Sequence, residues 1–321
     1  LLFLPADAPE SLGIEADNLE RIDTEVSLSN PLKSVVFEEF ALPRRLKGAR
    51  VDLYYSPSFL LPAFKSAAVE INCVHDLAWR ILPSSKSVLF RTYMNRRLPA
   101  ALKRATRIVC VSDSTRKDVL KHYGTDLDER VRVVHNGVDL ERYCPAPADS
   151  PDEMPFVAVV GNYDPRKNIQ TLLEAFPTFR ARMRPCRLVM VGPGEPQGPR
   201  PPAVDFLGYL DEPELASLYR RALMVVQPSI YEGFGLPVLE AMACGTAVAC
   251  ADIPVFREIA ADAAHYFDPF DASSIARAMD RLARDEALRV TLARRGIERA
   301  QGFSWDETGR KLLAVFAEAV S

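Results

Sequence analysis

The sequence lacks the marks of several protein classes. No apolar run approaches the roughly 20 residues that a membrane-spanning helix requires. The six cysteines include no Cys-x-x-Cys pair, and the four histidines lack the spacing of a zinc site. We therefore expect no metal site, and we interpret the cysteines as buried free thiols, which indicates a reducing cytoplasm.

Further absences narrow the function. No Gly-x-Gly-x-x-Gly follows a predicted strand, which disfavours an NAD-dependent enzyme. The formal net charge of −3 argues against nucleic acid as a partner. The chain has no initiator Met, and Leu1–Pro5 has neither the basic start nor the cleavage pattern of a signal peptide. These residues have the pattern of a strand whose first residues are absent, so we expect that the true beginning of the chain is missing.

What is present indicates a large α/β protein. The 321 residues, 48% of them apolar, suffice for two domains. Four prolines in residues 144–155 mark a boundary, so we expect domains at 1–148 and 149–304, followed by a helix at 305–321. Strands are predicted at 22–28, 51–57, 68–76, 106–111, 131–139, 156–161, 187–192, 203–208, 223–228 and 246–251. Helices are predicted at 31–47, 87–104, 115–123, from 169 onward, 212–222, 237–244, 273–301 and 305–320. This alternation predicts parallel sheets with right-handed crossovers.

One stretch organises the second half. The apolar run 223–228 has the pattern of a buried parallel strand, and a second such run follows about twenty residues later. Between them lie Gly233, Gly235 and a short helix. Pro237 suits its first position, and Gly245 suits the left-handed residue just beyond its end. The helix N-terminus is thus predicted at the carboxyl end of a parallel strand, where open α/β sheets bind ligands.

The residue types at this corner suit a particular ligand. Small glycines let backbone N–H groups approach an anion, which the helix dipole also attracts, so a diphosphate is expected. Glu232 and Glu240 flank the spot, and carboxylates accept hydrogen bonds from hydroxyl groups. A phosphate between two hydroxyl-binding acids describes a nucleotide sugar. The alternative is that both glutamates merely cap or solvate a helix.

The stretch Glu232-Gly-Phe-Gly-Leu-Pro-Val-Leu-Glu240 resembles a known signature. It is similar to the E-x7-E motif of retaining GT-B glycosyltransferases, in particular the family-four, mannosyltransferase-like group. The resemblance covers the chain from about Val51 to its end. It implies an α/β GT-B fold, in which two Rossmann-like domains face a cleft and a C-terminal helix returns to the first domain.

The resemblance also implies roles for individual residues. Glu232 would face the donor hexose, and Glu240 would hold the ribose hydroxyls. Loop amides at Phe234 and Gly235 would lie near the diphosphate. The neighbouring loop residues Gly233 and Leu236 belong to the same expected binding site.

Three more residues are candidates through the resemblance. His75 follows a predicted strand and would contact the donor sugar; the alternative is a structural histidine. Arg166 and Lys167 would neutralise the leaving diphosphate, or form only a solvated basic turn. Lys167 matches a lysine of the family, whereas Asn162 stands where the family often has an arginine.

Two positions carry weaker expectations. Leu210 ends a segment that would receive the nucleotide base through backbone groups. Ser112 ends a predicted first-domain strand, and it either touches the acceptor or only caps the following helix.

The implied function is transfer of a hexose, with retention, from a nucleotide-diphosphate sugar to a saccharide or lipid-linked acceptor. GDP-mannose or a UDP-sugar is the favoured donor, and bacterial polysaccharide or glycolipid synthesis is the expected setting. The nucleotide sugar is a co-substrate, and neither a further cofactor nor a metal is expected. The alternatives are a GT-B nucleotide-sugar epimerase and an inactive nucleotide-sugar-binding protein.

A membrane partner is a second hypothesis. The helix from Arg91 to Arg104 is basic and partly aromatic, so it could rest on an anionic membrane and meet a lipid-linked acceptor. A solvated helix face is the alternative. The expected location is the cytoplasm, with peripheral contact at the inner face of the cell membrane.

Overall fold

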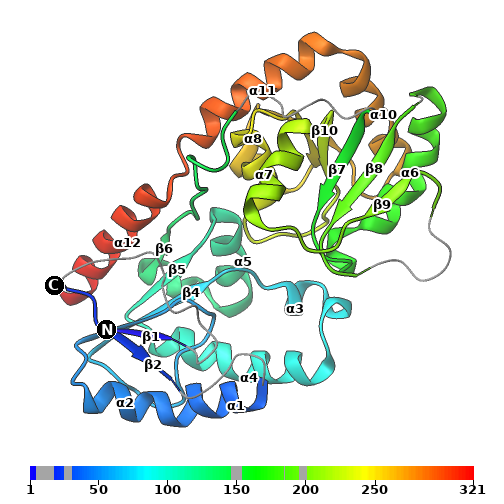
Figure 1. Cartoon of the computed structure of the whole chain (residues 1–321). Coiled ribbons are helices and arrows are strands. Elements are labelled where there is room, and N and C mark those ends of the chain that lie inside the picture. The colour runs from blue at the N-terminus through cyan, green and yellow to red at the C-terminus, as the bar shows by residue number, and fades with distance from the viewer. Residues whose placement is uncertain (5–17, 25–30, 146–153, 184, 195–200) are drawn as a thin grey trace.

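The computed structural model describes residues 1–4, 18–24, 31–145, 154–183, 185–194 and 201–321. It contains a four-stranded and a six-stranded parallel sheet, each flanked by helices, and a separate two-stranded pair (Figure 1). The predicted strand at 22–28 and the proline-rich segment 144–155 fall partly outside the described residues. The domain limits remain predictions.

The N-terminal half is built on the sheet β3-β4-β5-β6, in that spatial order. All three of its strand pairings are parallel. The strands of this half are β1 (Leu2–Leu4), β2 (Arg21–Asp23), β3 (Leu53–Ser56), β4 (Val69–Val74), β5 (Arg107–Cys110) and β6 (Val131–Val133). The helices are α1 (Pro31–Val36), η1 (Phe37–Ala41), α2 (Leu42–Gly48), α3 (Ala78–Ile81), η2 (Pro83–Ser85), α4 (Val88–Arg104), α5 (Asp113–Tyr123) and η3 (Thr125–Arg130).

The C-terminal half contains the six-stranded sheet in the order β12-β11-β10-β7-β8-β9. Its strands are β7 (Phe156–Val160), β8 (Arg187–Val191), β9 (Val204–Phe206), β10 (Met224–Gln227), β11 (Val248–Ala251) and β12 (Ala264–Phe267). The helices are η4 (Pro165–Lys167), α6 (Ile169–Arg182), α7 (Glu212–Arg221), α8 (Leu236–Ala243), α9 (Pro254–Ala260), α10 (Ala272–Arg284), α11 (Glu286–Ala300) and α12 (Trp305–Val320). Strands β7, β10 and β11 are almost entirely buried, as their uninterrupted apolar sequences predict.

The last helix, α12, returns to the N-terminal half, as expected (Figure 1). Glu318 accepts hydrogen bonds from Arg107 and Arg132, which belong to β5 and β6. The rings of Phe316 and Tyr55 lie 5.3 Å apart. The chain therefore ends against the sheet of the first half.

Several elements differ from the sequence-based expectation. The helix predicted at 31–47 contains a π-helical segment, η1, in its middle. The helical stretch predicted at 273–301 consists of two helices, because Asp285 ends α10 and caps α11 by accepting a hydrogen bond from the Leu288 amide. Pro237 is the second residue of α8, not the first, because the helix begins at Leu236. The helix α9 and the strand β12 were not predicted.

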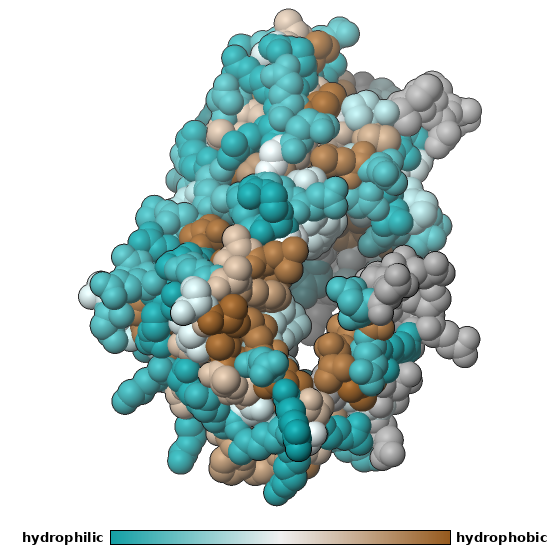
Figure 2. All heavy atoms as spheres, turned by 90° about the vertical axis from the view of Figure 1, so that its left-hand side faces the viewer, coloured by the Kyte–Doolittle hydropathy of each residue, from teal (hydrophilic) through white to brown (hydrophobic). Residues whose placement is uncertain are grey.

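A cavity of about 890 Å³ lies beside β3 in the N-terminal half. Its lining includes Leu2, Leu42, Leu53 and Phe316, so the first and last elements of the chain meet there. Figure 2, which looks at the side of α12, shows apolar side chains gathered around a hollow in the lower half of the molecule.

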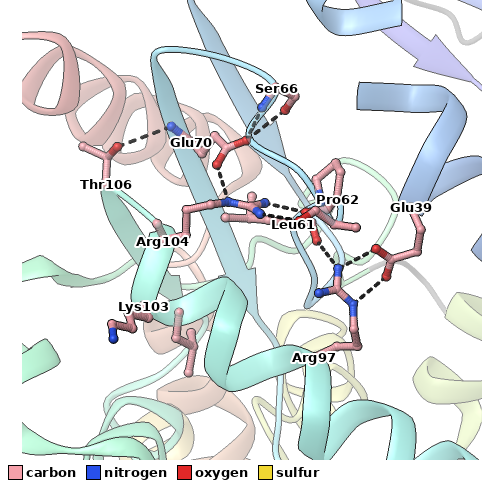
Figure 3. Close-up of polar contacts among 12 residues, drawn as sticks. Glu39, Leu61, Pro62, Ser66, Glu70, Arg97, Lys103, Arg104 and Thr106 are labelled. Carbon is pink, nitrogen blue, oxygen red and sulfur yellow. Dashed lines mark hydrogen bonds and ion pairs between the residues drawn. The ribbon is translucent and has the colours of Figure 1, made fainter. Parts of the chain in front are cut away.

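Helix α4 is less basic on its surface than its sequence suggests. Arg97 pairs with Glu39 through two hydrogen bonds, of 2.8 and 2.5 Å, and Arg104 donates to Glu70 at 2.7 Å (Figure 3). Both glutamates are buried, and Arg104 also donates to the Pro62 and Ala63 carbonyls. Two of the arginines that suggested a basic face therefore point into the protein and tie α4 to the rest of its domain.

No described helix has the length and apolar character needed to cross a bilayer.

Candidate active site

The loop between β10 and α8 forms a helix N-terminus at the carboxyl edge of the six-stranded sheet. Gly235 is the N-cap residue of α8 and has a φ of 109°, which a residue with a Cβ rarely adopts. In the part of the chain that the structure describes, the N–H groups of Phe234, Gly235 and Leu236 donate to no protein acceptor. Free amides at a helix start attract an anion, as the glycine pattern predicts.

Glu232 lies at the centre of a buried charge cluster. Its carboxylate accepts hydrogen bonds of 2.5 Å from Arg166 Nη1, 2.5 Å from Lys167 Nζ and 2.8 Å from Ser229 Oγ. Burial raises the pKa of Glu232, but the attraction of Lys167 and Arg166 outweighs burial and leaves the pKa below its usual value. Ser229 in turn receives a hydrogen bond from Gln227 at 3.0 Å, so β10 fixes the position of the acid. The structure thus brings three of the expected site residues together.

The two cations are positioned by a turn that follows β7. The side chain of Asp164 caps η4 by accepting a hydrogen bond from the Arg166 amide at 3.0 Å. The Lys167 side chain passes close to Gly161. A Cβ added to Gly161 would lie only 3.1 Å from Lys167 Cε. A glycine at this position therefore leaves room for the lysine to reach Glu232. The alternative of a merely solvated basic turn is wrong, because Lys167 is buried and Arg166 is mostly buried.

Glu240 lies apart from this cluster, on the second turn of α8. Its carboxylate accepts a 2.8 Å hydrogen bond from the buried Tyr219 hydroxyl. Burial raises the pKa of Glu240, while the Tyr219 hydrogen bond opposes the rise. Glu240 lines a cavity of about 520 Å³ together with Leu236, Asp139 and Trp305. An acid facing an open cavity is free to bind hydroxyl groups.

His75 follows β4, but its side chain points back into its own domain. Its Nε2 lies 2.5 Å from the Pro57 carbonyl oxygen, and its ring packs edge-on against Phe59. Hydrogen bonding with Cys73 raises the pKa of His75 to about 9, although burial opposes the rise. Its backbone carbonyl faces Gly233 instead. The arrangement suits a backbone role for His75 better than a side-chain role.

The glycine loop touches the N-terminal half directly. The Gly233 carbonyl accepts hydrogen bonds from Ser112 Oγ at 2.7 Å and Thr115 Oγ1 at 3.1 Å. A Cβ on Gly233 would lie 1.8 Å from the His75 carbonyl oxygen. Ser112 also caps α5 and is fully buried, so it bridges the two halves and has no surface to offer an acceptor.

A second contact between the two halves was not predicted from the sequence. Glu258 of α9 accepts hydrogen bonds from the Asp113 and Ser114 amides, at 2.7 and 3.0 Å, at the start of α5. His135 Nε2 lies 2.8 Å from the same carboxylate. Nothing local to Glu258 indicates a partner about 145 residues away.

The other residues expected at the site, Phe234, Leu236 and Leu210, do not come together in one cluster. The Phe234 ring is buried against His135 and Phe303. Leu236 lines the cavity of Glu240, whereas Leu210, between β9 and α7, does not line it. Leu210 packs partly buried against the core, so its expected contact with a base remains a prediction.

Both halves of the chain match family models. Residues 145–299 match "Glycosyl transferases group 1", and residues 3–142 match "Glycosyltransferase Family 4". O-antigen chain mannosyltransferase B of Escherichia coli is 30% identical over 82% of this chain and 74% of its own. Phosphatidyl-myo-inositol mannosyltransferase of Mycolicibacterium smegmatis is 33% identical over 66% of this chain and 57% of its own length. The match thus spans little more than half of that second relative.

A solved structure supports the architecture. Anabaena HepE, in complex with UDP and glucose, aligns with a TM-score of 0.71 at 18% identity, over 93% of this chain and 86% of its own. At this identity the likeness concerns the fold alone. Two facing parallel-sheet domains, the returning helix and the matches in both halves agree: the chain belongs to the family-four, group 1 glycosyltransferases and has the GT-B fold.

Proposed function

We propose that this protein transfers a hexose from a nucleotide-diphosphate sugar to a saccharide or lipid-linked acceptor. The observation that carries the proposal is the buried cluster of Glu232 with Arg166 and Lys167, beside the free amides of the α8 N-terminus. Cations and amides converge where a diphosphate would sit, and an acid lies next to them to receive a sugar hydroxyl.

These residues act on the charge that develops during transfer. As the bond between the hexose and the diphosphate breaks, negative charge accumulates on the leaving oxygen. Arg166, Lys167 and the loop amides are already fixed in place, so they stabilise that charge with little reorganisation. Glu232 orders the two cations and contacts the hexose, which gains oxocarbenium character.

We propose that transfer retains the anomeric configuration, by a front-face reaction in which the leaving phosphate takes the acceptor proton. Such a reaction needs no side-chain base. Glu232, already engaged by two cations and Ser229, then acts as an orienting and stabilising group. Because the cations and amides neutralise the diphosphate, the proposed reaction does not need a metal ion.

The relatives favour certain substrates. The Escherichia coli and mycobacterial relatives are named mannosyltransferases, which favours a mannosyl donor such as GDP-mannose. HepE is described in complex with UDP and glucose, which supports a UDP-sugar as the alternative donor. One relative is named for the O-antigen chain and the other for phosphatidyl-myo-inositol, which supports a saccharide or a lipid-linked acceptor. Peripheral contact with a membrane would suit the second kind.

A thermal-shift series with GDP, UDP, ADP and their sugar conjugates tests the donor site. A donor at about 100 times its Kd stabilises the folded protein by roughly 2.7 kcal/mol, which is a measurable shift. A selective response to one diphosphate identifies the base. If no nucleotide shifts the unfolding transition, the proposed function is wrong.

Turnover separates transfer from the two alternatives. An epimerase would convert the donor with no acceptor present, and an inactive binding protein would shift in melting temperature without releasing nucleotide. The named relatives favour neither, because all three comparisons point to glycosyltransferases. Release of nucleoside diphosphate that depends on an added acceptor would decide for transfer.

A further inference from the structure

The carboxylate of Glu232 occupies the corner where the cations of the candidate site converge. Its side chain is only 8% exposed. Arg166 Nη1 and Lys167 Nζ each donate a 2.5 Å hydrogen bond to it, and these two side chains reach no other acceptor among the described residues. A diphosphate that binds to the two cations must therefore share them with a carboxylate.

The charges of this cluster can be counted. Arg166 and Lys167 are positive, and Glu232 is negative, because the attraction of the two cations holds the pKa of its carboxyl below the usual value despite burial. Two more carboxylates, Asp76 and Asp164, also attract Arg166. An entering diphosphate consequently meets cations that are already partly neutralised, and it is repelled by Glu232 in a place from which most water is excluded.

The carboxylate cannot easily move away from a ligand, because its segment is tied on both sides. Before it, the Ile230 amide donates to the Arg166 carbonyl oxygen at 2.9 Å. After it, the Gly233 carbonyl accepts a 2.7 Å hydrogen bond from Ser112 Oγ. The negative charge of Glu232 therefore stays beside the cations when the site is filled.

The two oxygens of Glu232 are not equally occupied. Oε1 accepts hydrogen bonds from Lys167 Nζ and Ser229 Oγ, whereas Oε2 accepts one hydrogen bond, from Arg166 Nη1. Since each carboxylate oxygen can accept about two hydrogen bonds, Oε2 has room for one further donor. A hexose attached to the diphosphate can supply a hydroxyl group there. A nucleoside diphosphate without its sugar leaves that position empty.

We propose that Glu232 makes this site select a nucleotide sugar over the bare nucleoside diphosphate. Its charge weakens the binding of either diphosphate, and a hexose hydroxyl at Oε2 offsets that loss only for the nucleotide sugar. The inference rests on the proposed function, because it takes the diphosphate to lie at Arg166 and Lys167. It follows that the product of transfer, the nucleoside diphosphate, dissociates more readily than the donor.

Calorimetric titration of the whole chain, without acceptor, tests this inference with two pairs of ligands, GDP with GDP-mannose and UDP with UDP-glucose. Glu232→Gln removes the negative charge, so the bare diphosphate should bind at least about tenfold more tightly than it does to the unmodified protein. The nucleotide sugar gains the same relief but loses the charged hydrogen bond at Oε2, so its Kd should stay within about threefold. The preference for the sugar-bearing ligand should thus decrease.

Glu307→Gln is the matched control, because Glu307 of α12 also pairs with one arginine and one lysine, Arg310 and Lys311, but lies outside the candidate site. It should change no Kd. Glu232→Ala removes the carboxylate without placing an amide beside the cations, and it should tighten binding of the bare diphosphate as Glu232→Gln does.

Two results would overturn the inference while leaving the proposed function intact. One is that neither Glu232 variant binds the bare diphosphate more tightly than the unmodified protein does. The other is an equal loss of affinity for both members of a ligand pair, which would mean that Glu232 only orders the two cations. Failure of the unmodified protein to bind any of the four ligands would instead contradict the proposed function itself.

Discussion

Gly233 lies where the two halves of the molecule are in direct contact. Replacing it with alanine would place a Cβ 1.8 Å from the His75 carbonyl oxygen and 2.9 Å from Asp76 Cβ. Contacts of a real Cβ below 3.0 Å are essentially never seen, so the loop and the His75 segment must separate by at least 1.2 Å, the difference between 3.0 and 1.8 Å. The rest of each domain can remain folded.

The cost follows from what that movement breaks. A displacement of this size stretches the hydrogen bonds from Ser112 and Thr115 to the Gly233 carbonyl beyond bonding distance. Two lost hydrogen bonds of about 1 kcal/mol each, with overpacking of about 1–3 kcal/mol, destabilise the closed arrangement by roughly 3–5 kcal/mol. A misplacement of about 1 Å at reacting groups commonly lowers the rate about 100-fold.

We therefore expect Gly233→Ala to lower kcat/KM at least about 100-fold in an assay of acceptor-dependent nucleotide release. Gly309→Ala is the matched control, because a Cβ there meets nothing within 4 Å. Since Gly309 lies within α12, its replacement should leave activity intact and raise stability by about 0.5–1 kcal/mol. Near-normal kcat/KM in Gly233→Ala would refute the view that the contact between the halves positions the catalytic loop.

Four further outcomes are expected. Glu240→Ala should raise the KM for donor about 10- to 100-fold and leave kcat nearly unchanged, because it removes charged hydrogen bonds to the ribose; unchanged steady-state constants would contradict the ribose assignment. Lys167→Met should lower the single-turnover rate about 100- to 1,000-fold, as loss of one preorganised charge partner does, and an unaltered rate would exclude its role at the diphosphate. Arg104→Met should cost about 3–5 kcal/mol in denaturant unfolding, because Glu70 is then buried without a cation, and Arg104→Met/Glu70→Met should recover much of that loss. The pKa of Glu232 is lower in the folded protein than its ordinary value of 4.5, so its ionised form stabilises the fold above pH 4.5, and this stability is lost as the pH falls through the folded-state pKa. Glu232→Gln should therefore weaken the dependence of the unfolding free energy on acid pH. An unchanged dependence would show that another group dominates it.

The elements that the sequence predicts best are those with local signals. Asp211 and Glu214 form the capping box that begins α7, and Gly245 takes the left-handed conformation beyond the end of α8. Glu232 and its two cations could also be predicted as site residues, because a family signature identifies the acid and one of the cations matches a lysine of the family.

Other features depend on partners distant in the chain. Arg97 and Glu39 are 58 residues apart, and Arg104 and Glu70 are 34 apart, so helical spacing alone indicated a basic face that the folded chain neutralises. The π-helical turn at 37–41 likewise has no local sequence signal, since its residues are ordinary helix formers. The break at Asp285, in contrast, has a local sequence signal. An aspartate followed by Glu286 is typical of a helix start, even inside a continuous helical pattern.

The contact between Glu258 and the start of α5 has a consequence for where anions can settle. Both α5 and α8 begin where the two halves meet, and each helix start carries a partial positive charge. Glu258 supplies α5 with an internal counter-anion, whereas the amides at the start of α8 keep their donors free. Of these two helix starts, only that of α8 therefore keeps amides that could receive the diphosphate of the proposed donor.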